Sequence, residues 1–172
     1  MSERHGVRGV LAGVAGGLVA SWVMNQFLSG PGKKLTEAVQ TPEENRKQAR
    51  HADDEDATMK AADAIVNTVT GGRHLSRKEK ETDGPIVHYV FGALMGGVYG
   101  GLAEFSPAVR SGFGTSFASV LFAGGDLVAI PALGLSVSPA KGNKAALVTP
   151  YAAHLVYGLT TELVRRLVRK VV

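Results

Sequence analysis

The segment 84–103 has the sequence GPIVHYVFGALMGGVYGGLA and contains no charged residue. A helix of about 20 predominantly apolar residues is as long as the hydrocarbon core of a bilayer is thick. Three further segments, 9–28, 111–131 and 145–164, have a similar length and apolar character. The sequence therefore predicts an all-α integral membrane protein, a four-helix bundle with four spans.

Charged residues are segregated from these apolar segments, and concentrate in 31–83 and in the C-terminal tail. The basic residues flank the apolar runs, whereas a nucleic-acid-binding protein carries them in one stripe with aromatic residues between them. We expect the lipid bilayer as partner, together with further copies of the chain or a larger membrane complex, and no nucleic acid. The absence of cysteine excludes disulfides, thiolate metal ligands and cysteine nucleophiles.

The chain 1–172 is expected to form a single membrane domain, with 31–83 as a polar helical insertion between the first and second spans. Within the insertion, Thr41 and Glu44 have the spacing of a capping box, which predicts a helix start. Further on, apolar residues recur at helical spacing beside a polar strip, which predicts an amphipathic helix that lies in the membrane interface or caps the bundle. These apolar residues are Met59, Ala62, Val66 and Val69.

Glycine recurs at every fourth position on one face of each of the first two spans. The first set is Gly9, Gly13 and Gly17, and the second is Gly92, Gly96 and Gly100. This spacing lets two helix backbones approach closely, which matters in lipid because the hydrophobic effect gives membrane helices no reason to associate. We interpret the stripes as helix packing inside the bundle, and a dimerisation seam is the alternative.

A short repeat suggests two tandem helical hairpins. The segment 88–92, HYVFG, resembles 154–158, HLVYG, and each follows a proline, Pro85 or Pro150, that is expected in a first helical turn. Asp83 and Thr149 are the expected caps of these two helices.

Four alternating spans place both termini on one side of the membrane, and 31–83 and 137–144 on the other. Arginine is frequent at the termini, so the positive-inside rule predicts that both termini lie in the cytoplasm. The expected location is a bacterial inner membrane, which the chain crosses several times.

Four polar side chains within the predicted spans are candidates for a site: Asn25, His88, Asp126 and His154. At a rise of 1.5 Å per residue, all four come to a similar depth near the 31–83 side. Such an intramembrane polar cluster can join the helices by hydrogen bonds, or it can handle protons or ions. It can also bind a metal, or a b-type haem through His88 and His154. Structural hydrogen bonding is the ordinary interpretation, so no cofactor or metal is expected.

A second polar group is expected at the opposite boundary, as interface ion pairs among Glu104, Arg110, Glu162, Arg165 and Arg166. Glu162 is three residues from Arg165 and four from Arg166, so the three side chains share one helix face. No nucleophile or paired base accompanies these carboxylates, and no catalytic motif is present, so no catalytic residues are predicted and an enzyme is not expected.

The order of motifs in the second half resembles the YagU-like family of bacterial inner-membrane proteins. These motifs are His88, Ala103-Glu104, PALGLSVSP over 131–139, HLVYG over 154–158 and ELVRR over 162–166. The resemblance covers 84–170 and, more loosely, the first span, and is weak over 31–83. It implies the inner membrane and four spans but no activity, because the family is a domain of unknown function. Some members have histidine where this chain has Asp126, which argues against a strict ligand role for that carboxylate.

The sequence thus predicts a polytopic inner-membrane protein without catalytic activity, acting as an oligomer or as an accessory subunit of a membrane complex. The alternative is a small proton-, ion- or metal-handling channel or carrier that uses the intramembrane cluster.

Overall fold

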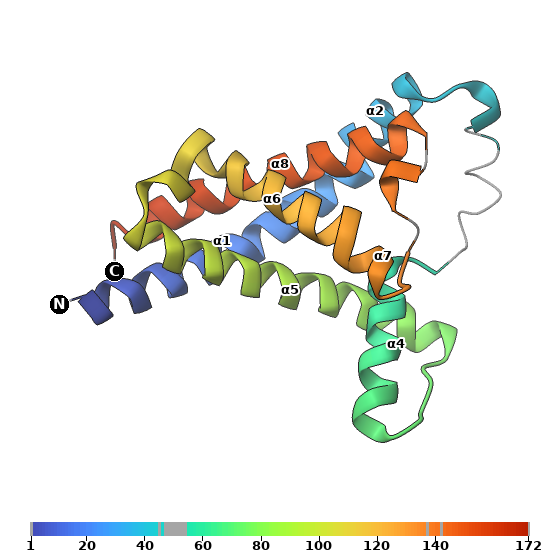
Figure 1. Ribbon diagram of the computed structural model, residues 1–172, viewed down its shortest axis with the longest axis horizontal. Coiled ribbons are helices and arrows are strands. Elements are labelled where there is room, and N and C mark those ends of the chain that lie inside the picture. The colour runs from blue at the N-terminus through green and yellow to red at the C-terminus, as the bar shows by residue number, and fades with distance from the viewer. Residues whose placement is uncertain (1, 45, 47–54, 137, 142, 172) are drawn as a thin grey trace.

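The computed structural model describes residues 2–44, 46, 55–136, 138–141 and 143–171. Every regular element within them is helical, which confirms the all-α class. Four helices lie roughly along one common direction (Figure 1), and they are α1 (Ser2–Ser29), α5 (Arg77–Phe105), α6 (Thr115–Gly124) and α8 (Lys144–Val168). Helix α1 packs along both α5 and α8, and α6 packs on α8.

Three stretches of the described chain are long and apolar enough to cross a membrane: His5–Ser29, Arg77–Phe105 and Pro107–Ala132. They coincide with three of the four predicted spans. The fourth predicted span, 145–164, falls within α8, which is 25 residues long but is interrupted by polar side chains and does not reach the same apolar content.

The third stretch is less regular than predicted. Its first part is a 3₁₀ segment, η1 (Pro107–Gly114), in which Gly112 and Phe113 have positive φ angles of 61° and 57°. The continuous helix therefore begins at Thr115 and not at residue 111. It continues from α6 through a π-helical turn, η2 (Gly125–Ala129), into the short α7 (Ile130–Ala132), with the 3₁₀ turn η3 (Pro139–Lys141) before α8.

Helices α5 and α8 begin earlier than expected, so the predicted caps Asp83 and Thr149 are wrong. Helix α5 begins after Ser76, which forms a capping box with Glu79, and α8 begins after Asn143, whose side chain accepts a hydrogen bond from the Ala146 amide at 2.9 Å. Both prolines consequently lie inside helices. Proline is tolerated there in membrane helices because neighbouring groups satisfy the backbone carbonyls that it leaves free.

The insertion between α1 and α5 contains helices, as predicted. Helix α2 (Pro31–Val39) lies against α8, where the hydroxyls of Thr36 and Thr149 are 2.9 Å apart. The capping box at Thr41 is confirmed, since its amide donates to the Glu44 carboxylate at 2.7 Å and its hydroxyl accepts from the Glu44 amide at 3.3 Å. Helix α4 (Ala57–Thr70) follows and crosses the end of α5 at a steep angle (Figure 1).

The interior is built from small and polar residues, and large apolar side chains point outward. Alanine dominates the buried positions, and Ser21, Thr161 and Glu162 are buried with it. The exposed side chains include Leu11, Trp22, Phe91, Leu94, Val120, Leu159 and Leu163. A soluble protein places its large apolar residues inside, whereas helices in lipid are held together by small residues that permit close approach. The distribution supports a multi-pass membrane protein.

The glycine stripes of α1 and α5 face each other directly. A Cβ added at Gly96 would contact the carbonyl oxygen of Gly13 and lie 2.7 Å from the Cα of Gly17, and one added at Gly100 would lie 2.8 Å from the Cα of Gly13. The stripes therefore form a backbone contact inside the chain, and the helices run antiparallel. The same register continues through Ser21 and Gly92.

Candidate intramembrane site

Asp126 and His154 form the closest pair of the predicted polar cluster. The Nε2 atom of His154 on α8 lies 3.8 Å from Oδ1 of Asp126 on the π-helical turn, and 12% and 21% of their side chains are exposed. The extra residue of a π-turn changes the direction of the side chains that follow it, and such turns are frequent at functional sites. Asp126 reaches α8 from this turn.

The other ring nitrogen of His154 has a fixed partner. Its Nδ1 lies 2.9 Å from the carbonyl oxygen of Pro150, which can only accept a hydrogen bond. Nδ1 therefore carries a proton and donates it, so Nε2 is the atom that faces the carboxylate. The ring also packs against Phe122, with centroids 5.3 Å apart.

His88 and Asn25 do not hydrogen-bond to this pair. The Nε2 atom of His88 is buried without a hydrogen-bond partner, and the side chain approaches the backbone of Ser21. The antiparallel register of α1 and α5 places Asn25 opposite His88, and the Asn25 amide makes no hydrogen bond within the described part of the chain. Within the described residues, the predicted cluster thus consists of one pair, Asp126 and His154.

A second polar group occupies the opposite end of the bundle, where interface ion pairs were predicted. Glu162 is fully buried, and its carboxylate accepts hydrogen bonds from Arg165 at 2.7 and 3.1 Å, from Arg166 at 2.6 Å and from the Tyr99 hydroxyl at 2.8 Å. Glu104 accepts from Arg169 at 2.8 and 3.1 Å and from Arg165 at 3.4 Å. The group therefore connects α5 to α8, with Glu162 and Arg165 buried inside the bundle and Arg166 half-exposed at its surface.

Three residues differ between the predicted ion pairs and this network. Arg110 is exposed and forms no ion pair with the described residues, because η1 turns away before the helix starts. Tyr99 and Arg169 were missed. A tyrosine facing the interior from a glycine-rich helix, and an arginine one turn beyond Arg165, were the available signals.

Helix α8 carries a row of polar side chains between the two groups. His154, Tyr157, Thr161 and Arg165 are spaced by three, four and four residues, so they share one helix face. Tyr157 is buried and donates a hydrogen bond to the Gly92 carbonyl at 2.6 Å. The hydroxyls of Thr161 and of the nearby α1 residue Ser21 are buried without partners. Buried hydroxyls of this kind commonly bind internal water.

No group of three or more histidine, aspartate or glutamate side chains with metal-binding geometry occurs among the described residues. The residues present therefore give the metal alternative no support. Comparison with family models, with curated proteins and with solved structures yields no match.

Proposed function

We propose that this chain is a four-span protein of a bacterial inner membrane that binds and releases protons at the Asp126–His154 pair. The observation that carries the proposal is the 3.8 Å approach of a carboxylate and an imidazole between two helices of an apolar bundle. Ionisable groups at membrane depth are expensive, and where they occur they commonly form relays for protons.

The fourth span in this proposal is α8. Its exposed apolar side chains extend from Leu147 to Leu167, about 30 Å along the helix axis, which equals the thickness of a bilayer core. Its polar residues Thr149, Thr161 and Glu162 are buried against the other helices. Inward-facing polar groups lower the apolar content of α8 without exposing polarity to lipid.

Single cysteines in this naturally cysteine-free chain test the topology. Ala38, Lys141 and Val171 are exposed and lie outside the proposed spans, so labels there do not disturb packing. With four spans, a membrane-impermeant maleimide reaches Ala38→Cys and Lys141→Cys from one side and Val171→Cys from the other. Labelling of Lys141→Cys and Val171→Cys from the same side would exclude a fourth span.

The chemistry of the pair follows from which atoms can donate. With Nδ1 committed to Pro150, an unprotonated Nε2 and an ionised Asp126 are both acceptors and cannot hydrogen-bond to each other. One added proton, on either Nε2 or the carboxylate, supplies the missing donor and lets the two atoms close from 3.8 Å to hydrogen-bond distance. The pair therefore has two states that differ by one proton.

Two further features favour proton handling over a purely structural accessory role. The glycine stripes of α1 and α5 already contact each other, so they are not available to bind a partner subunit. The 104–110 end of the bundle contains the buried Glu162 network in place of an apolar seal. Polar groups therefore occur at both ends of the bundle and along α8 between them.

Proton flux into vesicles tests the proposal directly. The protein would be reconstituted with a trapped pH-sensitive dye, and a potassium diffusion potential would drive proton entry. We expect flux above that of protein-free vesicles, and its loss in Asp126→Asn and His154→Gln, which preserve shape. Asp83→Asn, a carboxylate on the same side outside the pair, is the matched control and should retain the flux. Wild-type flux equal to that of protein-free vesicles would refute the proposal.

The accessory role remains a second candidate because of a groove on the outer surface. This groove, about 540 Å³, lies between α1 and α5 and has an entirely apolar lining that includes Val14, Leu18, Ile86 and Val90. A helix of another membrane subunit would fit such a surface. In that case Val90→Trp would dissociate the complex, as seen by native mass spectrometry, and would leave proton flux unchanged.

A further inference from the structure

Helix α4 lies at the level where the second apolar run begins. Gly84, the first residue of that run, is in contact with Thr58 and Met59 in the first turn of α4. From there α4 extends sideways, steeply inclined to α5 (Figure 1). If α5 crosses the membrane, α4 therefore runs along the membrane plane at the boundary between lipid and water.

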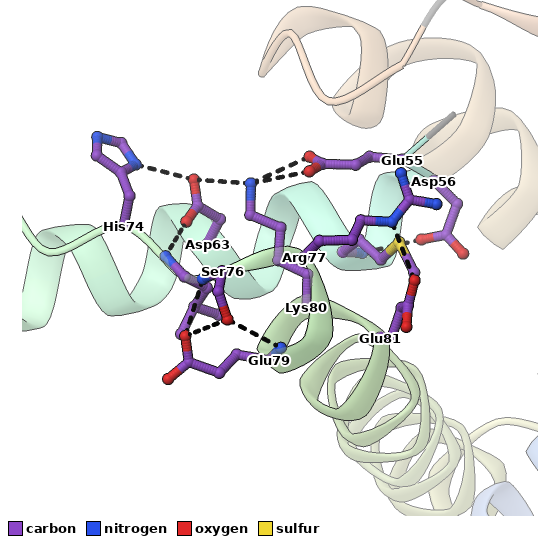
Figure 2. Close-up of polar contacts among 11 residues, drawn as sticks. Glu55, Asp56, Asp63, His74, Ser76, Arg77, Glu79, Lys80 and Glu81 are labelled. Carbon is purple, nitrogen blue, oxygen red and sulfur yellow. Dashed lines mark hydrogen bonds and ion pairs between the residues drawn. The ribbon is translucent and has the colours of Figure 1, made fainter. Parts of the chain in front are cut away.

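The polar face of α4 is held toward the water side. Asp63 accepts hydrogen bonds from the Leu75 amide at 2.6 Å and from His74 at 3.0 Å, and Lys80 lies 3.5 Å from it and 3.1 Å from Glu55 (Figure 2). All these partners precede Gly84 in the chain. Since α5 extends away from the bilayer before Gly84, this polar cluster marks the aqueous face of α4.

The opposite face of α4 is apolar and uncovered. At 100° per residue, Ile65 lies about 160° around the helix from Asp63, and Val69 lies about 120° from it. Ile65 is 53% exposed and Val69 79% exposed, although both are large apolar residues.

We infer that α4 is an interfacial helix that inserts Ile65 and Val69 among the lipid headgroups and upper acyl chains. Amphipathic helices of this kind lie in the membrane plane with the apolar face buried at the headgroup boundary. A lipid partner accounts for both observations: the Asp63 carboxylate is engaged on the water side, and the exposed apolar side chains Ile65 and Val69 lie on the face toward the bilayer. The inference rests on the membrane position proposed above and is independent of proton binding.

Spin labels at single cysteines test the placement in vesicles of phosphatidylethanolamine and phosphatidylglycerol. The label at Val69→Cys should collide more with oxygen, which partitions into lipid, than with a water-soluble nickel complex. The label at Lys60→Cys, exposed on the polar face of the same helix, is the matched control and should show the reverse ratio. Both sites are exposed, so neither label displaces packed residues.

A third label at Val90→Cys, exposed in the middle of α5, separates the two ways of failing. Oxygen access at Val69 and Val90 with nickel access at Lys60 supports the interfacial helix. Nickel access at Val69 with oxygen access at Val90 overturns it and leaves the membrane position intact. Nickel access at Val90 overturns the membrane position itself, and the interfacial helix with it.

Discussion

Replacing Gly96 by alanine is expected to destabilise the bundle, although alanine is the better helix former. The new Cβ would contact the Gly13 carbonyl oxygen and lie 2.7 Å from the Cα and 2.8 Å from the amide nitrogen of Gly17. All three are backbone atoms of α1, so no side chain can move aside. Restoring an ordinary contact distance of 3.4 Å at the Cα of Gly17 requires α1 and α5 to separate by about 0.7 Å, and the closer Gly13 carbonyl oxygen requires more.

The size of the effect follows from the length of the contact. Separation at Gly96 also opens the neighbouring contacts made by Gly92 and Gly100, because α1 and α5 are rigid rods. A gap of 0.5–1 Å removes about a quarter to a half of the dispersion energy of each atom pair. Overpacking typically costs about 1–3 kcal/mol, and we expect the upper end of this range because lipid supplies no hydrophobic driving force to close the gap.

Unfolding in mixed detergent micelles measures the change, with helicity and the fluorescence of Trp22 as signals. Trp22 is the only tryptophan of the chain and lies on α1. Gly124→Ala is the matched control, because a Cβ at Gly124 meets nothing within 4 Å. An unfolding midpoint of Gly96→Ala at or above that of the wild type would refute the reasoning.

Two further predictions concern charged groups. Arg165→Met leaves the carboxylate of Glu162 without its two-point partner inside the bundle, so we expect a loss of about 3–5 kcal/mol in the free energy of unfolding. Arg166→Met, at a half-exposed site, should cost less than about 1 kcal/mol. Equal unfolding midpoints for the two variants would contradict this prediction. The hydrogen bond from His74, followed by that from the Leu75 amide, lowers the pKa of Asp63. The stability that the ionised Asp63 contributes to the fold is therefore present above the unfolded carboxyl pKa of about 3.9, and it is lost as pH falls through the lower folded pKa. A nitroxide at Val69 should therefore become more mobile in acid in the wild type but show no such transition in Asp63→Asn.

The apolar spans and the glycine contact could be predicted from the sequence because each depends on a local pattern. The length of an apolar run determines whether it can cross a bilayer, and glycine at every fourth position determines which face can approach a neighbour. The capping box at Thr41 is likewise complete within four residues. Such features do not depend on where the rest of the chain lies.

The details of the candidate site could not be predicted in this way. Depth along a helix follows from residue number, and it placed Asp126 and His154 at one level. The direction in which a side chain points around the helix axis does not follow from residue number. The π-turn rotates the Asp126 side chain relative to a regular helix, and this turn cannot be recognised from the sequence. The burial of Glu162 also depends on another helix, α5, which supplies Tyr99 from a distant part of the chain.

The backbone contact between α1 and α5 has a consequence for the order in which the protein is made. About 75 residues separate the end of α1 from the end of α5, which at about 5–20 residues per second is about 4–15 s of synthesis. During that time the glycine stripe formed by Gly9, Gly13 and Gly17 has no matching helix to contact. Helix α1 thus becomes part of a folded protein only when α5 arrives, and a nascent chain arrested within the insertion would leave it unanchored to any partner.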